Sequence, residues 1–315
     1  MTGYLIRRII QSIVVLIGVS IIVFLMLHLL PGGAARAQLG VRANPAAVKA
    51  FAHAQGYDKP VVIQYFDYIA KLGHGDLGFS FKNNQSVTSL LAQYLPKSAY
   101  LSLVALVISV IIAIPLGIAQ ALRRNKPMDY TMTAASFVGY SMPVFWLGLL
   151  LIAIFGIYLP IFPTEAPQTD SVFGAIADPR AMVLPVATLV IISVSSFSRF
   201  MRSSAIDNLA QDYMRTARAK GLRERTVLYT HMLRNAMLPL ITLIGLSIPT
   251  LVGGNLITEQ VFNYPGVGLL FYNSALSRDY PTELALTLLG ALLVIVGNLV
   301  ADIAYAVADP RVRLS

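Results

Sequence analysis

The sequence contains no cysteine and is poor in charged residues. Only 12% of its 315 residues are charged, against roughly 25% in an ordinary soluble domain. Without cysteine the chain has no disulfides, no thiol chemistry and no cysteine-ligated metal. Hydrophobic residues make up 56% of the chain. Water is therefore not its main solvent, and we expect a polytopic, all-α membrane protein.

Sequence motifs for phosphate binding, metal binding and catalysis are also missing. The sequence has no Gly-x4-Gly-Lys-Ser/Thr phosphate loop, and its four histidines form no His-Glu-x-x-His pattern. Gly139-Tyr140-Ser141-Met142-Pro143 begins like a nucleophile elbow but lacks the closing glycine, so a proline kink in a helix is the better interpretation. We therefore predict no catalytic residue, no cofactor bound by this chain and no metal site, which argues against a membrane enzyme.

Six long stretches contain no Asp, Glu, Lys or Arg. Each approaches or exceeds the roughly 20 residues that a helix needs to cross a bilayer. Backbone groups in hydrocarbon must be satisfied within the segment, so we predict helices. Pro115, Pro143 and Pro185 lie inside these stretches and predict kinks. The predicted spans are 9–30, 98–122, 133–159, 181–198, 235–258 and 284–301.

The placement of basic residues predicts the orientation. Most of the 24 Lys and Arg residues lie on one side of the six spans if the N-terminus is cytoplasmic. Lys and Arg are enriched in cytoplasmic loops, so we expect both termini inside, including the tail 309–315. The net charge of +9 is then explained by basic residues that collect on the cytoplasmic side of a lipid bilayer, and we predict no nucleic-acid partner.

Two loops are longer than a connection between helices needs. Residues 31–97 follow the N-terminal transmembrane helix, 1–30, and contain amphipathic runs at 46–54 and 64–71, so we predict an extracytoplasmic lobe. A cap that only covers the helices is the alternative. Residues 199–234 are predicted to be a basic cytoplasmic loop within a five-helix transmembrane core, 98–308, and should form helices on the inner surface.

A short helix is predicted inside this cytoplasmic loop. Asp207 and Asp212 precede its basic residues and Gly221 follows them, as at a helix stop. Tyr213, Ala217 and Gly221 recur every four residues and form one ridge of mostly small groups. Such a ridge permits close approach of another protein, but a basic amphipathic helix also binds anionic lipid headgroups. These residues alone leave both possibilities open.

Residues 213–222, followed by His231 to Pro239, resemble the cytoplasmic EAA loop of binding-protein-dependent ABC importer permeases. The resemblance is greatest to the B-type subunit of the dipeptide/oligopeptide branch, although Arg215-Thr216-Ala217 stands where the wider family has its glutamate. Other matches follow in order over essentially the full length: Leu29-Leu30-Pro31-Gly32, Gly75-Asp76-Leu77-Gly78, Leu95-Pro96, Ile114-Pro115-Leu116-Gly117, Ser141-Met142-Pro143, Leu184-Pro185, Glu259-Gln260-Val261-Phe262, Pro265-Gly266-Val267-Gly268, Arg278-Asp279-Tyr280-Pro281 and Asp309-Pro310-Arg311-Val312-Arg313.

The resemblance implies a type I ABC importer fold in the plasma (inner) membrane of a bacterium or archaeon. Implied partners are a second homologous permease, two ATPase subunits that bind ATP and Mg, and an extracytoplasmic binding protein. Peptides are the implied cargo, with nickel, glutathione and oligosaccharides as alternatives. The implied ATPase-coupling residues are Tyr213, Arg215, Thr216, Ala217, Arg218, Ala219, Lys220, Gly221 and Leu222.

Two further sets of candidates concern the path and the outer side. Uncharged polar or flexible residues within predicted spans are candidates to line the path: Ser141, Met142 and Asn255. An aromatic and polar run between glycine turns is the candidate contact with the binding protein: Phe79, Ser80, Phe81 and Asn83. The alternative class is a proton-coupled secondary carrier, which needs a membrane carboxylate, and Asp302 is the candidate near a span.

Overall fold

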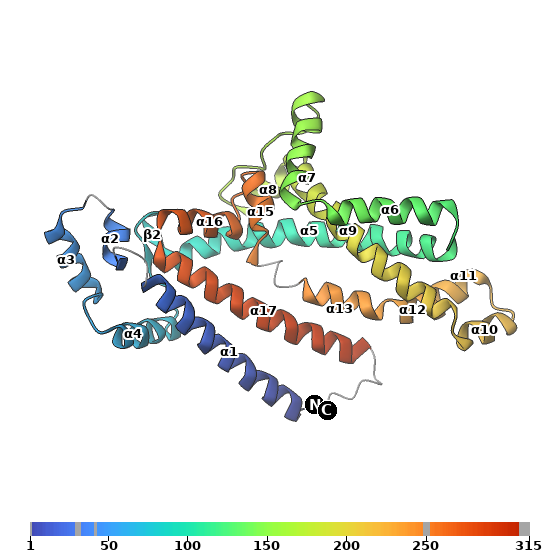
Figure 1. Cartoon of the computed structure of the whole chain (residues 1–315), viewed down its shortest axis with the longest axis horizontal. Coiled ribbons are helices and arrows are strands. Elements are labelled where there is room, and N and C mark those ends of the chain that lie inside the picture. The colour runs from blue at the N-terminus through green and yellow to red at the C-terminus, as the bar shows by residue number, and fades with distance from the viewer. Residues whose placement is uncertain (1, 29–32, 41–42, 248–252, 309–315) are drawn as a thin grey trace.

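The computed structural model describes residues 2–28, 33–40, 43–247 and 253–308. The body is elongated and helical, with α2 (Gly33–Leu39), α3 (Pro45–Gln55) and α4 (Val61–Gly73) at one end and α10 (Asp212–Ala219) at the other (Figure 1). Pro31, the predicted start of the outer lobe, and the tail 309–315 lie outside the described residues. Asp302 lies in a described helix, but its side chain is outside the description.

Three unbroken helices are long and apolar enough to cross a membrane: α5 (Val87–Leu122), α9 (Pro179–Leu209) and α17 (Tyr280–Ala308). They contain the second, fourth and sixth predicted spans. The first lies in α1 (Thr2–His28), whose apolar part is Ile10–Met26. α1 runs toward the lobe and α17 runs away from it, so the first residue of α1 and the last of α17 lie on the α10 side (Figure 1).

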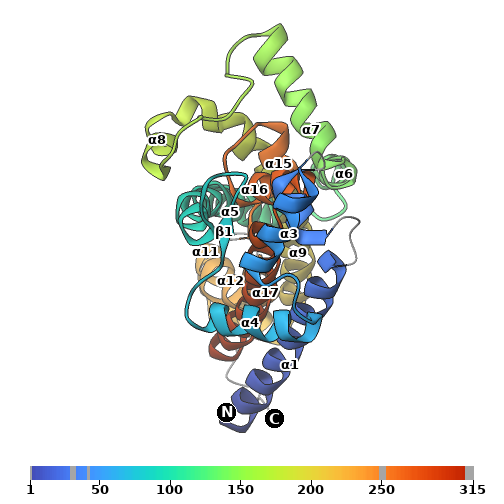
Figure 2. The same ribbon diagram turned by 90° about the vertical axis from the view of Figure 1, so that its left-hand side faces the viewer.

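The third predicted span, 133–159, is not one helix. α6 (Pro127–Ser141) and the segment formed by α7 (Val144–Leu151) and the π-helical η1 (Ile152–Tyr158) meet at 103°. Pro143 explains the break, because proline lacks an N–H and pushes the residue before it out of the helical region. Figure 2 shows α7 projecting away from the packed helices.

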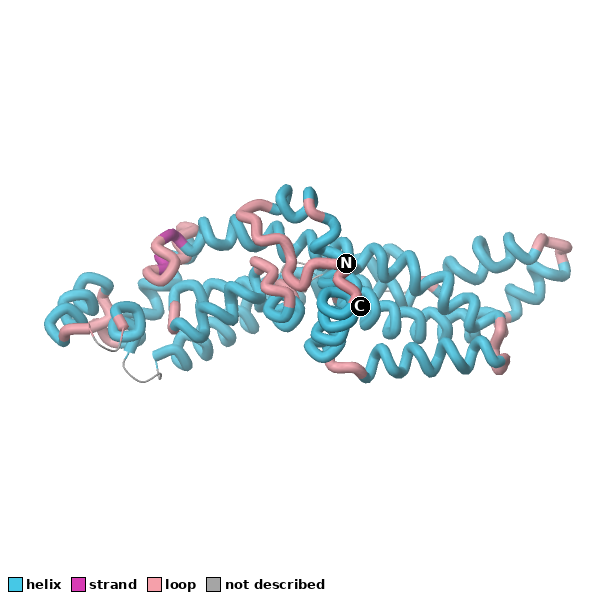
Figure 3. The backbone as a smooth tube through the Cα atoms, turned by 90° about the horizontal axis from the view of Figure 1, so that it is seen from above, coloured by secondary structure: helices cyan, strands magenta, loops and turns pink. Residues whose placement is uncertain are grey.

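The fifth predicted span, 235–258, is likewise divided. The helical segment Glu224–Ala236, which ends in α12 (Leu233–Ala236), and α13 (Leu238–Leu246) bend by 45° from one another. α15 (Leu256–Val261) follows residues 248–252, which lie outside the description. α16 (Val267–Ser277) then leads to α17. Figure 3 shows that most of the described chain is helical, with loops between the helices and one small pair of strands.

The core lies mainly between α5 and α9. Its first part, the central cluster, joins α5, α7, α9 and the residues after α15: Leu101, Ala105, Leu147, Leu151, Met182, Leu184, Phe262 and Tyr264. The second part, the α10-side cluster, joins α5, α9, α13 and the segments between α9 and α13: Ala113, Ile118, Phe197, Met201, Ala205, Met214, Ala217, Val227, Met232 and Leu240. α5 approaches α9 closely at Gly117, where a Cβ would overlap Met201.

The predicted amphipathic runs 46–54 and 64–71 fall within α3 and α4. A small antiparallel hairpin follows, β1 (Phe79–Ser80) and β2 (Gln85–Ser86), with Phe79 opposite Ser86. The lobe is attached to the spans through aromatic contacts, since Phe24 of α1 packs against Tyr65 and Tyr68 of α4. Short helices complete the chain: α8 (Val172–Ala177), α11 (Glu224–Thr226) and the π-helical η2 (Val227–Met232).

Candidate functional site

The predicted cytoplasmic helix is α10, and it is anchored to the body of the chain. α9 continues past its apolar part to Leu209, and α10 starts at Asp212. Met214 and Ala217 of α10 are buried in the α10-side cluster with Val227. Because the interior of a protein is close-packed, a displacement of α10 must move the residues it packs against, including those of α5 and α9.

The outward face of α10 and of the turn after it is basic. Its exposed residues are Arg215, Thr216, Arg218, Ala219, Lys220, Gly221 and Leu222. Arg218 donates two hydrogen bonds to Glu224, at 3.2 and 2.8 Å, and this contact raises the pKa of the Arg218 guanidinium. Arg215 lies 3.5 Å from Asp212, both side chains being exposed, and Lys220 is also exposed, so this face can meet a partner surface of opposite charge.

The ridge of Tyr213, Ala217 and Gly221 does not form one outward surface. Ala217 is only 4% exposed and faces the chain's own core. Tyr213 is half-buried and donates a hydrogen bond to Asn208 at 2.7 Å. Of the three, Gly221 alone is exposed.

The helix stop at Gly221 has the predicted geometry. Its φ is +74°, in the left-handed region, and its N–H bonds to the carbonyl of Arg218 at 2.9 Å. The N–H of Leu222 reaches back to Ala217, as in a Schellman motif. A Cβ at Gly221 would meet no atom within 4 Å, so the left-handed backbone rather than crowding within this chain requires glycine.

A bidentate ion pair joins α6 to α9 on the α10 side. Arg202 donates from Nε and Nη2 to the two carboxylate oxygens of Asp129, both at 2.7 Å. Asp129 is buried and also accepts the backbone N–H of Asn125. The fork geometry fixes the orientation of α6 against α9.

The three candidate path residues have different surroundings. Ser141 is exposed at the break between α6 and α7, and Met142 packs against the central cluster. Asn255 is tied to α5, because its side chain donates to Ser102 at 2.8 Å. Ser141 and Met142 therefore lie together at the break between α6 and α7. The side chain of Asn255 instead connects its own segment to α5.

A buried carboxyl group lies next to Asn255. Glu259 is fully buried and accepts hydrogen bonds from the hydroxyl of Ser98 at 2.7 Å and from backbone N–H groups, those of Asn255 and Leu269 at 3.0 Å each. Gly268 also donates its backbone N–H to it. The carboxyl group thus fixes the start of α16 against α5, as anions do at a helix N-terminus.

The glycines beside Glu259 are required by close packing. A Cβ at Gly266 would overlap Ser98 and Glu259, and one at Gly268 would overlap the backbone of Leu256. Only glycine lets the backbone approach the carboxyl group this closely. The Pro-Gly-x-Gly pattern therefore serves the Glu259 contact.

The outer hairpin combines anchored and exposed residues. Ser80 is buried and donates to Asp279, which follows α16, and Thr282 donates to the same oxygen at 2.8 Å. Asn83 donates to the hydroxyl of Ser80 at 3.0 Å. The rings of Phe79 and Phe81 are about two-fifths exposed (40% and 41%), so these two residues and Asn83 remain accessible from solvent.

Comparisons with known proteins agree with this geometry. Residues 113–314 match the family described as binding-protein-dependent transport system inner membrane component, and residues 1–104 match the N-terminal membrane component of such systems. The chain belongs to this family. The permease is 39% identical to the oligopeptide transport system permease protein AppB of Bacillus subtilis, over 99% of this chain and 100% of that protein. It is 37% identical to the glutathione transport system permease protein GsiC of Salmonella typhi, over 99% of each.

Family membership accounts for the type I ABC permease fold and for apolar helices in the membrane. Sequence reasoning placed α10 and its glycine stop but missed three contacts in the permease: Ser98 with Glu259, Ser80 with Asp279, and Asp129 with Arg202. Each joins residues far apart in the chain. The only sequence signal was a carboxylate beside a span and next to closely spaced glycines, at Glu259.

Proposed function

We propose that this permease forms one half of the path of an ATP-driven importer for short peptides delivered by an extracytoplasmic binding protein. A second homologous permease encloses the other half, because six helices alone make only a small bundle. The named relatives support the cargo class. One is an oligopeptide permease and the other a permease for glutathione, which is itself a tripeptide.

The observation that carries the proposal is the two-sided character of α10. Its buried side, Met214 and Ala217, is packed into the α10-side cluster, and its exposed side is basic. Two partner ATPases, which bind ATP and Mg, would each hold such a helix from one permease. Their closure on ATP would move α10, and the packed cluster would pass the movement to α5 and α9.

The outer end of the permease is proposed to receive the binding protein. We assign the start of α1 and the end of α17, which lie on the α10 side, to the cytoplasmic side of a bacterial or archaeal membrane, and the lobe to the outside. The exposed Phe79 and Phe81 of the hairpin are the proposed contacts, with Asn83 beside them. Ser80 holds the hairpin to Asp279 rather than meeting the partner directly.

Reconstitution tests the proposal. The complete complex in liposomes should take up a labelled tripeptide only with ATP on the ATPase side and binding protein on the lobe side. The isolated permease should hydrolyse no ATP, because it lacks a phosphate loop. Uptake by the permease alone, driven by a proton gradient, would overturn the proposal in favour of a secondary carrier.

A further inference from the structure

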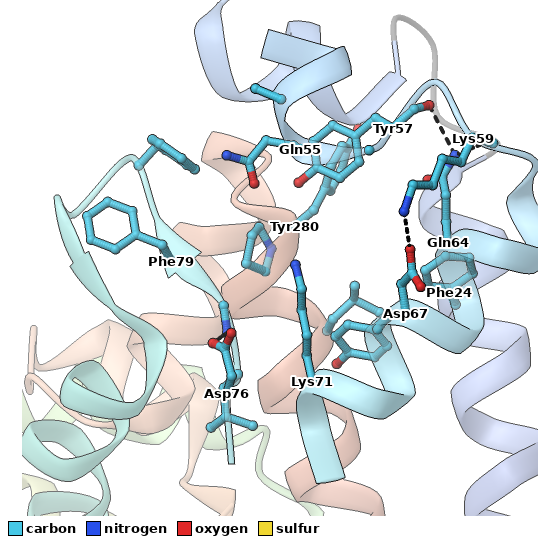
Figure 4. A pocket seen from close by; sticks show the side chains of 18 of the residues that line it. Phe24, Gln55, Tyr57, Lys59, Gln64, Asp67, Lys71, Asp76, Phe79 and Tyr280 are labelled. Atoms are coloured by element: carbon cyan, nitrogen blue, oxygen red, sulfur yellow. Dashed lines mark hydrogen bonds and ion pairs between the residues drawn. The ribbon is translucent and has the colours of Figure 1, made fainter. Parts of the chain in front are cut away.

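A cavity of about 450 Å³ lies where the lobe meets the outer ends of α1 and α17 (Figure 4). Its volume is within the range of about 300–1,000 Å³ typical of sites for small molecules. Phe24 and Tyr280 contribute from the spans, and Tyr57, Tyr68 and Phe79 from the lobe. The lining therefore joins two parts of the molecule and is rich in aromatic rings.

Two groups of opposite charge line this cavity without an ion pair. Lys71 extends from α4 between Asp76 and Tyr280 (Figure 4) and forms no ion pair with any described residue. Asp76 accepts only the backbone N–H of Gly78, at 2.9 Å, among the bonds found in the described chain. Both residues are exposed, so they can meet a ligand directly.

The other charged groups around the cavity are already paired. Lys59 contacts Asp67 at 2.6 Å, and His53 contacts Asp58 at 2.6 Å. A ligand would therefore meet one ammonium group without an ion pair, that of Lys71, and one carboxylate that can accept further hydrogen bonds, that of Asp76.

Two buried hydroxyl groups belong to tyrosines that line the cavity. The hydroxyl oxygens of Tyr68 and Tyr280 are buried, and neither has a hydrogen-bond partner in the described part of the chain. Burial raises the pKa of Tyr68 to about 12, so its hydroxyl keeps its proton at neutral pH. Because both oxygens are closed to solvent, these two residues meet a ligand through their rings rather than through their hydroxyl groups.

We infer that this cavity is a site for a short zwitterionic peptide on the outer face of the permease. Lys71 receives the terminal carboxylate, Asp76 the terminal ammonium, and the aromatic rings the side chains between them. The inference rests on the proposed function for the identity of the ligand as cargo. A loop of the binding protein, with an acidic and a basic side chain, is the alternative occupant, and the experiments below separate it from a free peptide.

Equilibrium dialysis of a labelled tripeptide against the purified permease–ATPase complex, without binding protein, tests this inference. Saturable binding is expected. Lys71→Gln and Asp76→Asn should each weaken it about tenfold, the loss expected for one hydrogen bond to a charged group. Lys49→Gln is the matched control, because Lys49 is an exposed lysine of α3 that does not line the cavity.

Blocked peptides supply a second readout that needs no variant to fold. An N-acetylated tripeptide should bind the wild type as weakly as the free tripeptide binds Asp76→Asn, and acetylation should weaken Asp76→Asn no further. A C-terminal amide should show the same relation to Lys71→Gln. Equal binding of free and blocked peptides, or the absence of saturable binding, would overturn the inference.

The results distinguish failure of this peptide site from failure of the proposed function. ATP-dependent uptake by the wild-type complex together with no binding in the cavity would reject this site alone. Weaker association of Lys71→Gln with the binding protein, without peptide binding, would reject it in favour of a protein contact. Peptide binding that depends on Lys71 and Asp76, without ATP-dependent uptake, would support the site and reject the proposed function.

Discussion

Ser98 and Glu259 lie on different helices and join their hydroxyl and carboxyl groups at 2.7 Å. The Ser98 oxygen also accepts the N–H of Val267 at 2.7 Å, so one serine serves both the carboxyl group and the start of α16. Among the described residues, every other donor to the carboxyl oxygens is a backbone N–H. Replacing either side chain therefore leaves buried donors without acceptors.

Glu259→Gln and Ser98→Ala should both destabilise the permease, by about 1–3 kcal/mol for each buried group left unsatisfied. The glutamine places an NH₂ group where at least one donor already points. Thermal unfolding of the purified complex should show a lower Tm for both variants. Ser109→Ala is the matched control, since Ser109 is also buried in α5 but, among the described residues, its hydroxyl bonds only to its own helix, at Ala105. A control as unstable as Ser98→Ala would contradict this account.

The coupling face can be mapped with single cysteines, because the chain has none of its own. Ala219→Cys, carrying a photoreactive maleimide, should cross-link to an ATPase subunit, because Ala219 is exposed. Ala217→Cys is the control two residues away and should react little with the reagent, because Ala217 is 4% exposed. Gel electrophoresis after illumination measures the cross-link. Efficient cross-linking from position 217 instead would place the partner on the opposite face of α10.

Local patterns in the sequence predicted the three unbroken spans in α5, α9 and α17, the apolar part of α1 and the end of α10, but the third and fifth predicted spans are divided. The lack of charge over a membrane-length run depends on neighbouring residues alone, and so does a glycine stop after basic residues. The direction in which Ala217 faces could not be predicted. Helical spacing groups Tyr213, Ala217 and Gly221 but does not say whether their side meets the chain's own core or a partner.

Contacts between distant segments could not be predicted from the sequence for the same reason. Ser98 and Glu259 are 161 positions apart, and Ser80 and Asp279 are 199 apart. The 103° turn at Pro143 was expected as a kink, but its size depends on how α7 packs rather than on the proline itself. The contact made by Asn255, one of the path candidates, could not be predicted either. Its side chain bonds to Ser102 of α5, and the sequence does not show that these two residues are neighbours.

Sidedness of the membrane is tested by the same cysteine-free background. Ser171→Cys should react with an impermeant maleimide in intact cells, because Ser171 is exposed in the loop before α8 and is predicted to lie outside. Ala219→Cys should react only after the cells are permeabilised. Mass spectrometry or gel shift reports both. Labelling of Ala219→Cys in sealed cells would invert the proposed orientation.

A substitution in the hairpin tests whether it contacts the binding protein. Phe79→Ala removes an exposed ring and should reduce the ATP hydrolysis stimulated by liganded binding protein several-fold, while basal hydrolysis persists. Phe66→Ala is the control, because Phe66 is an equally large exposed ring of the lobe that lies on α4 rather than on the hairpin. Equal stimulation of the Phe79→Ala and wild-type complexes would mean that the hairpin only covers the channel.

Gly221 tests whether α10 must end in a left-handed turn to transmit movement. A branched side chain in that conformation costs roughly 1–2 kcal/mol, whereas asparagine adopts it more readily. Gly221→Leu should therefore lower peptide uptake per ATP hydrolysed without preventing assembly, and Gly221→Asn should stay close to the wild type. Proteoliposomes in which uptake and hydrolysis are measured together give this ratio.

The pair of variants also separates backbone conformation from contact. A Cβ at Gly221 has open space within this chain, so any steric effect must come from a partner. Equal loss of coupling in Gly221→Asn and Gly221→Leu would therefore assign the requirement for glycine to close approach by the ATPase. Loss in Gly221→Leu alone would assign it to the turn, because asparagine has the same branching and number of side-chain heavy atoms as leucine but keeps the left-handed conformation accessible. Normal coupling in both would contradict a role for this stop in transmission.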